Sequence, residues 1–368
     1  MRRTTTRAFA IAAASALALG AGTLSAAAGG RGHDHGHRHG PAGPPAATTV
    51  TTGLVAALSF DVTGRGAVVG QPSGAIDLVR DRGTTTQLVA PRGDAAEAVS
   101  VHGGTISWAT TPRDETTFEA TSSTVWRTDH RGRTTKVADL LAYERRHNPD
   151  HRNTYGFSGL DPACAGTLPP DLLPHRGIVD VHPYQSVTHG GRLYVADAGA
   201  NAVLSVDRRG TVRTVAVLPP VKVKVTAAMA ETAGLPGCVV GATFALDPVP
   251  TDVEVGPHGV LYVSTLPGGP EDGSFGPRGA VWRVDPRSGR TTRVASGFLG
   301  ATNLAVTRAG DVYVAEMFGG KVTRVSAHGR RSVVLTTAAP VAVEIRGSSL
   351  YVLSDPFAAG TLQRLRVR

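Results

Sequence analysis

Apolar and polar positions alternate in short runs along this chain, and one of these runs recurs. It centres on a Tyr-Val pair and occupies residues 192–197, 260–265, 311–316 and 349–354. Alternation with a period of two is typical of β-strands. In the first three copies a Gly stands three residues before the Tyr, which predicts a tight turn ahead of the strand. Self-similarity of this kind predicts a repeat architecture.

The three clearest copies each contain four strand-like segments. One alternating segment precedes the Tyr-Val run and two more follow it, with Gly-, Pro- or Asp-containing turns between them. Four short strands joined by tight turns predict one antiparallel sheet for each copy. The copies recur at intervals that fit propeller blades of roughly 40 residues plus insertions.

Two weaker copies precede these, at 54–90 and 95–140, and the last copy, within 341–367, has only three strands. The Thr-rich segment 48–52 belongs to no copy and is expected to supply the missing strand, which removes open sheet edges. We therefore predict an all-β fold over residues 48–368. It is a six-bladed β-propeller of four-stranded antiparallel blades, closed by an N-terminal strand that joins the last blade.

Two long inserts interrupt the repeat, at 141–183 and 219–250, and residues 229–233 of the second are expected to form a short helix. Both inserts follow the fourth strand of a blade, so we expect them on the same face. Cys164 lies in the first insert and Cys238 in the second. An even cysteine count in an exported chain favours a disulfide between them, and two unrelated buried thiols are the alternative.

Residues 1–28 have the pattern of a signal peptide. Three Arg residues precede an apolar run at 8–24, and small residues follow up to Ala28, near which we expect cleavage. The alternative is a retained anchor, but the run is diluted by Ala and Gly and falls short of the roughly 20 apolar residues that span a bilayer. We therefore expect a secreted or extracellular protein whose mature chain has no transmembrane segment.

Residues 29–47 are rich in His, Gly and Pro and are expected to form a flexible linker. Imidazoles at two-residue spacing could gather a borderline metal such as Zn, Cu or Ni, and a solvated polar tail is the alternative. The candidate metal ligands are His33, His35, His37 and His39.

The chain carries 38 Lys and Arg against 29 Asp and Glu, a formal net charge of +9. The basic residues are scattered rather than gathered on one stripe, so we do not expect nucleic-acid binding. The charge is compatible with a mild attraction to anionic polymers of the cell envelope.

Familiar catalytic spacings such as H-E-x-x-H, C-x-x-C and the P-loop are absent from the sequence. Polar residues that open first strands or end second strands are expected near the propeller axis on the insert-bearing face. Converging oxygens there could bind Ca²⁺, another divalent metal or a polar ligand, and the alternative is that they cap turns. The candidate ligand-binding residues are Tyr184, Asp197, Asp252, Asn303 and Glu316.

Residues 182–201, 249–263 and 297–316 resemble the ScyD/ScyE family of exported bacterial propellers, and 139–150 are similar as well. The resemblance implies a fold but no catalytic residues, and Thr265 stands where it implies an acidic residue. The chain is more distantly similar to NHL and gluconolactonase-type six-bladed propellers. The lactonases use a Glu in their first blade, where the nearest acid here is Asp61, so the resemblance does not support lactonase activity.

Together these features favour a secreted binding or interaction module of the cell envelope or extracellular space. Its expected partner is a small polar ligand, an envelope polymer or another exported protein. One alternative is a metal-dependent hydrolase or lactonase acting at the axial pocket, with Asp197, Asp252, Asn303 and Glu316 holding the ion. The other alternative is metal handling by the His-rich tail.

Overall fold

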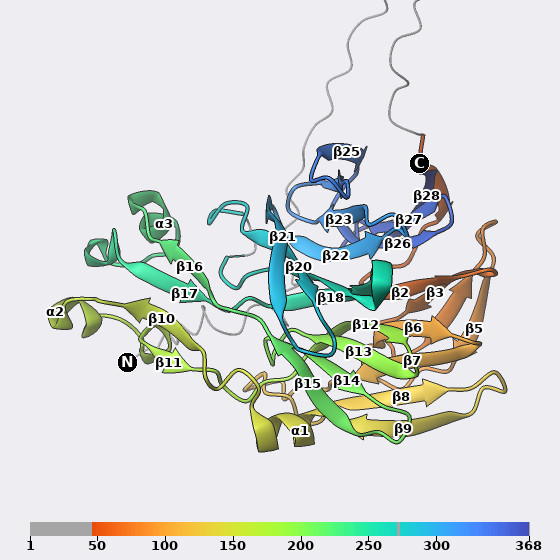
Figure 1. Ribbon diagram of the computed structural model, residues 1–368, viewed down its shortest axis with the longest axis horizontal. Helices are drawn as coiled ribbons and strands as arrows, with labels where there is room; N and C mark the ends of the chain where they lie inside the picture. The colour runs from red at the N-terminus through yellow and green to blue at the C-terminus, as the bar shows by residue number, and fades with distance from the viewer. Residues whose placement is uncertain (1–45, 271–272, 368) are drawn as a thin grey trace, which may run out of the picture.

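The computed structural model describes residues 46–270 and 273–367. Over these residues the chain forms seven four-stranded antiparallel sheets. Six sheets are blades whose innermost strands contact one another in a closed circle, and the seventh stands beside the ring at the left of Figure 1. The predicted all-β propeller fold is confirmed, and the ring is consistent with six blades.

Each of the first five blades runs outward in chain order. Blade one consists of β2 (Phe60–Thr63), β3 (Gly66–Gly70), β4 (Ile76–Val79) and β5 (Thr85–Val89). Blade two consists of β6 (Glu97–His102), β7 (Thr105–Thr110), β8 (Thr124–Thr128) and β9 (Thr134–Asp139). Blade three consists of β12 (Pro183–His189), β13 (Arg192–Asp197), β14 (Ala202–Val206) and β15 (Val212–Val217).

The remaining blades repeat this plan. Blade four consists of β18 (Pro250–Val255), β19 (Leu261–Thr265), β20 (Gly279–Val284) and β21 (Thr291–Phe298), with a 3₁₀ turn, η3 (Pro257–Gly259), between its first two strands. Blade five consists of β22 (Ala301–Val306), β23 (Val312–Glu316), β24 (Lys321–Val325) and β25 (Arg331–Thr336). Blade six consists of β26 (Pro340–Arg346), β27 (Ser349–Ser354), β28 (Thr361–Arg366) and β1 (Thr48–Thr51).

The N-terminal strand closes the ring as expected. Thr48 pairs with Arg364 and Thr49 with Gln363, so β1 becomes the outer strand of blade six. Across the closure, the carboxylate of Asp81 in blade one accepts hydrogen bonds from Tyr351 Oη and Arg364. The first and last parts of the described chain are thus held together by backbone pairing as well as side-chain contacts.

The repeated Tyr-Val run forms the second strand of its blade and is buried on both faces. In β13, Leu193 and Val195 pack in a cluster with blade two and the first insert, whereas Tyr194 and Ala196 pack against blade four. Burial on both faces explains why the run is nearly continuous in apolar residues. Gly191, three residues before the Tyr, has φ +77°, which a glycine adopts without strain.

The two inserts build the seventh sheet, which the sequence analysis did not foresee. Its strands, in spatial order, are β11 (His175–Arg176), β10 (Thr154–Ser158), β17 (Thr243–Leu246) and β16 (Val221–Lys224). Around it lie α1 (Leu140–His147), α2 (Pro162–Ala165), α3 (Ala227–Thr232) and the 3₁₀ turns η1 (Pro170–Leu172) and η2 (Gly237–Val239). The helix α3 covers most of the short helix expected in the second insert.

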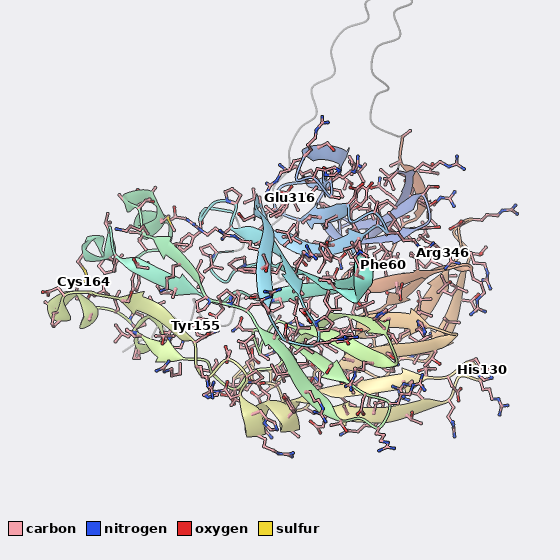
Figure 2. All side chains as sticks on the ribbon, in the orientation of Figure 1. Phe60, His130, Tyr155, Cys164, Glu316 and Arg346 are labelled. Atoms are coloured by element: carbon pink, nitrogen blue, oxygen red, sulfur yellow. A yellow bond between two sulfur atoms is a disulfide. The ribbon has the colours of Figure 1, made fainter. Side chains whose placement is uncertain are left out.

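The predicted disulfide between Cys164 and Cys238 is present, with 5.9 Å between the two Cα atoms. It joins α2 of the first insert to η2 of the second. Figure 2 shows Cys164 at the outer end of the insert sheet and Tyr155 closer to the ring. None of the helices in the described part of the chain is long and apolar enough to cross a membrane.

Candidate functional site

The two ends of the ring differ in what they carry. Both inserts follow a fourth strand, so they leave the ring at one end, which we call the insert end. The turns between the first and second strands and between the third and fourth strands of a blade, such as the one that contains His130, lie at the opposite end, which we call the hairpin end. In Figure 2 Cys164 and His130 mark these two ends at the left and right of the view.

Two of the predicted site residues link neighbouring blades. Asp252 Oδ1 accepts the Val253 N–H at 2.7 Å, and its Oδ2 accepts the Leu304 N–H of blade five at 2.9 Å. Asn303 Oδ1 accepts the Val343 N–H of blade six at 2.7 Å. Backbone N–H groups of the ring therefore donate to these oxygens. This is the capping role that we gave as the alternative to ligand binding, and here it joins neighbouring blades.

Asp61, which was noted above only for its position, makes the same link from blade one. Its Oδ1 accepts the Val62 N–H, and its Oδ2 accepts the Val101 N–H of blade two, each at 2.6 Å. Burial raises the pKa of Asp61 to about 6, although these two bonds oppose the shift. Burial likewise raises the pKa of Asp252 to about 8, and the nearby charge of Asp61 adds to the rise.

Two glutamates on the inner strands lie close to these aspartates. Burial raises the pKa of Glu254 well above its ordinary value, and the charges of Asp252 and Asp61 raise it further. Burial raises the pKa of Glu344 in the same way, with the charges of Glu254, Asp61 and Asp252 adding to it. The axis of the ring therefore concentrates acidic side chains from blades one, four and six.

Glu316 ends the second strand of blade five and is only 3% exposed. Its Oε2 accepts the Leu299 N–H at 2.9 Å, and its Oε1 accepts the Thr323 hydroxyl at 2.5 Å. The Lys321 ammonium lies 3.8 Å from Oε1. Figure 2 shows Glu316 in the upper part of the ring, far from Tyr155 at the insert sheet. Its contacts are those of a local cap.

Tyr184 lies where blades one, two and three meet. It lines a small cavity of about 30 Å³ together with Gln71 and Glu97. Its ring packs edge-on against His182, with 5.6 Å between the ring centroids. Burial acts to lower the pKa of His182, but the Glu97 carboxylate, 3.0 Å from its Nε2, outweighs burial and raises it.

The five predicted residues therefore do not converge on one point. Over residues 46–270 and 273–367, no group of three or more His, Cys, Asp or Glu side chains is arranged to hold a metal ion. The candidate ligands His33, His35, His37 and His39 lie outside the described residues. Among the five, only Asp197 keeps a buried oxygen without a hydrogen-bond partner.

Asp197 lies near Glu144, which the sequence analysis did not select as a site residue. Its Oδ1 accepts the N–H groups of His182 and Ala200, whereas its Oδ2 has no partner. Glu144 on α1 also has both carboxylate oxygens buried without a partner, and burial together with the charge of Asp197 raises its pKa to about 9. The further oxygens without a partner in this region are Asn148 Oδ1 and Asp150 Oδ1.

One sequence signal could have identified Glu144. It shares the buried face of α1 with Leu140 and Leu141, and all three are at most 5% exposed. A glutamate on the apolar face of a short helix is unusual because burying a carboxylate is unfavourable without a partner. The sequence alone could not place Asp150 and Asp197 next to it, because they belong to a loop and to another blade.

At the hairpin end, a cleft of about 930 Å³ separates blades three and four. Its basic side chains come from β12, β13, β15 and two hairpin turns, namely His189, Arg192, Arg213, His258 and Arg287. Asp285 is the acidic residue in its lining, and its carboxylate accepts N–H groups of its own turn. Neither Arg192 nor Arg213 lies within ion-pair distance of a described carboxylate.

A second cleft of about 260 Å³ lies between blades two and three at the same end. Its lining includes His102, Arg127 and Arg208, and Arg192 lines both clefts. Positive charge therefore extends across blade three at the hairpin end, whereas the buried carboxylates without partners lie at the insert end.

Comparisons with known proteins define the fold class. No family model matches the sequence, and no curated protein matches it. Among solved structures, the chain is similar to a structural genomics protein of unknown function from Bacteroides thetaiotaomicron, with a TM-score of 0.53 and 11% identity over 87% of this chain and 75% of that one.

Two further solved structures show the same similarity. One is a candidate oxidoreductase (glucose dehydrogenase) from Thermus thermophilus, with a TM-score of 0.51 and 17% identity over 87% of this chain and 100% of that one. The other is regucalcin, a calcium-binding protein from Agrobacterium tumefaciens, with a TM-score of 0.50 and 14% identity over 88% of this chain and 96% of that one. At these identities the similarity shows a β-propeller fold and does not transfer an activity.

Proposed function

We propose that this chain is an exported β-propeller that binds an anionic ligand of the cell envelope or extracellular space. The observation that carries the proposal is the cleft between blades three and four. It is lined by five basic side chains, and no described carboxylate lies within ion-pair distance of the Arg192 or Arg213 guanidinium group. Guanidinium groups recognise phosphate and carboxylate through charge-assisted hydrogen bonds.

Export itself is part of this proposal. The signal-peptide pattern at 1–28 and the linker at 29–47 are sequence features outside the described residues. The Cys164–Cys238 disulfide supports the proposal because disulfides persist in oxidising compartments. Membership of the ScyD/ScyE family is likewise proposed, on the sequence resemblance alone.

The contacts of the proposed axial ligands do not favour the alternative of a metal-dependent hydrolase. Asp252, Asn303 and Glu316 direct their oxygens to backbone N–H groups or to a hydroxyl of the ring. An ion held by them would have to displace these bonds. Metal handling by the His-rich tail stays a separate prediction.

Binding can be tested with a poly(glycerol phosphate) polymer, using calorimetry at about 50 and 200 mM salt. We expect the Arg192→Ser/Arg213→Ser variant to bind roughly tenfold more weakly and to show a smaller salt dependence than wild type. The matched control is Arg65→Ser/Arg82→Ser, which removes the same charge from exposed turns of blade one. Equal weakening in both variants, or no binding by wild type to this polymer or to a carboxylated one, would overturn the proposal.

A further inference from the structure

The cleft between blades three and four, which we call the first cleft, and the second cleft between blades two and three are parts of one basic surface. Arg192 at the start of β13 lines both clefts. The second cleft adds Arg127 of β8 and Arg208 of the turn that follows β14. Among the described residues that line it, none is Asp or Glu. Positive charge therefore borders blade three on both of its faces.

Arg127 and Arg208 border the second cleft from opposite sides. Arg127 comes from blade two, where it pairs in register with Ser107 of β7, another residue of the lining. Arg208 comes from blade three and packs on the turn before β13, where a Cβ at Gly191 would lie 3.2 Å from its Nε and 3.3 Å from its Nη2. No described carboxylate lies within ion-pair distance of either guanidinium group. The charges of both arginines are therefore available to a ligand in the cleft.

Equivalent positions in other blades show what a structural arginine looks like in this ring. Arg127, Arg324 and Arg364 occupy the same place on the third strand of blades two, five and six, opposite the Tyr position of the repeated run. Arg324 Nη2 lies 2.6 Å from the Asp311 carboxylate, and Arg364 forms an ion pair with Asp81. The ring therefore supplies a counter-charge to this arginine in blades five and six, and it supplies none to Arg127.

The acidic residues of the nearby turns bond to their own backbone. Asp129, Asp207 and Asp285 follow the third strands of blades two, three and four. The Oδ1 atom of each accepts two N–H groups of its own turn, at 2.8 to 3.2 Å. These N–H groups hold the pKa of all three carboxyls below the ordinary value, and the Arg192 charge adds to the effect at Asp207. The three aspartates therefore stabilise the turns, and none of them forms an ion pair with an arginine of the clefts.

The span of this surface restricts the kind of ligand that can cover it. Blade three packs face to face with blade two on one side and with blade four on the other. Packed sheets lie about 10 Å apart, so the two clefts are separated by a distance of that order. A single phosphate or carboxylate group cannot reach both clefts, whereas a chain of repeated anionic units can.

We propose that the ligand is a linear polyanion, with a phosphate or carboxylate on each unit, that occupies both clefts at once and crosses blade three at Arg192. This inference rests on the proposed function, because it extends the anion site of the first cleft. Arg213 holds one segment of the chain, and Arg127 and Arg208 hold another through charge-assisted hydrogen bonds. Once the first segment is bound, binding of the second is intramolecular, so affinity increases with chain length.

The linings of the clefts favour such a polymer over a single-stranded nucleic acid. Grooves that bind single strands combine basic residues with aromatic rings on which the bases stack. Of the described residues that line the second cleft, none is Phe, Tyr or Trp. Tyr194 lines the first cleft but is only 8% exposed. The surface therefore offers charge for a polymer backbone and little aromatic surface for bases.

The test compares glycerol-phosphate oligomers, and carboxylated oligomers in parallel, of about one and about ten units on the mature chain by calorimetry. We expect the affinity of wild type to rise at least about a hundredfold with length, beyond the roughly tenfold statistical gain from the larger number of units. Arg127→Ser/Arg208→Ser should bind the short oligomer as wild type does, which shows that the variant is folded. Its gain with length should fall to the statistical value.

Two further variants serve as controls. Arg127→Lys/Arg208→Lys keeps the charge and should keep most of the gain with length. Arg65→Ser/Arg82→Ser removes the same charge from exposed turns of blade one and should keep all of it.

The possible failures are distinguishable. A merely statistical gain in wild type, or a full gain in Arg127→Ser/Arg208→Ser, would overturn the two-cleft inference and leave the first cleft as the anion site. No binding of either kind of oligomer at either length would overturn the proposed function as well. Tighter binding of a single-stranded oligonucleotide of equal charge would overturn the assignment to a polymer without bases.

Discussion

Buried carboxylates at the axis of the ring and at the insert end differ in the hydrogen bonds that they accept. Asp252 at the axis accepts two backbone N–H groups, one from its own strand and one from the next blade. Glu144 at the insert end accepts none, although it is as deeply buried. Residue type and burial therefore do not distinguish a structural carboxylate from a candidate binding group. A carboxylate whose oxygens accept backbone N–H groups has a structural role.

The ring and the insert sheet also differ in the interactions that stabilise them. The blades close through backbone pairing between β1 and β28, whereas the insert sheet joins two segments far apart in the chain and carries the disulfide. Its strands β10 and β17 pair through three residues each. We therefore expect the insert sheet to depend on cross-links and the ring to be stable without them.

Removing the disulfide should have the largest effect on stability, and that effect should be confined to the insert sheet. In the chain-entropy model, a cross-link between residues separated by 74 positions contributes about 4 kcal/mol, so Cys164→Ser/Cys238→Ser should lower the free energy of opening the insert sheet by that order. Hydrogen exchange should become faster at the amides of β10 and β17 and stay unchanged in the blades. Equal acceleration in ring and inserts would contradict the distinction.

Removing a blade-to-blade link should have the next largest effect. Asp252→Ala leaves the buried N–H groups of Val253 and Leu304 without their acceptor, and each unsatisfied group costs about 1–3 kcal/mol. We expect urea unfolding to show a loss of about 3 kcal/mol. Asp252→Asn, which retains one acceptor oxygen, should lose less. A change below about 0.5 kcal/mol in Asp252→Ala would show that the link is not structural.

The axial glutamates should give a smaller, pH-dependent effect. Burial and the charges of Glu254, Asp61 and Asp252 raise the pKa of Glu344 in the folded state. Its contribution to stability is therefore complete below the unfolded pKa of about 4.3 and is lost as pH rises through the folded pKa. The loss amounts to about 1.4 kcal/mol for each unit between the two pKa values.

Glu344→Gln should remove this pH dependence. Unfolding by urea at pH 4 should give similar stability for wild type and variant, and at pH 8.5 the variant should be the more stable. Burial raises the pKa of Asp61 and the Arg346 charge opposes that rise. Both groups are present in wild type and variant, so the difference between the two proteins reports the Glu344 charge. A variant that is less stable than wild type at pH 8.5 would mean that the Glu344 charge is compensated.

Much of the ring could be predicted from the sequence because its signals are local and repeated. Tyr194 and its counterparts identify the second strand of a blade, and Gly191 identifies the turn before it. The unpaired Thr-rich strand predicted the closure with β28. The insert sheet was not predicted, because β10 and β17 are short, differ from the repeat and pair across a long sequence separation.

The candidate sites were harder to predict for the same reason. Asp252 and Asn303 fit the expectation of polar residues on the inner strands, but their bonds to the next blade depend on how the blades pack. The basic cleft combines Arg192 and Arg213 of blade three with the turn of blade four that carries Arg287. No local pattern in the sequence brings these three residues together.

The most direct test of the proposed function is a crystal structure of the mature chain grown with a short glycerol-phosphate oligomer. The account predicts phosphate oxygens within hydrogen-bond distance of Arg192 and Arg213, in the cleft between blades three and four. An oligomer bound only at the insert end or along the axis, with the cleft filled by solvent, would contradict it.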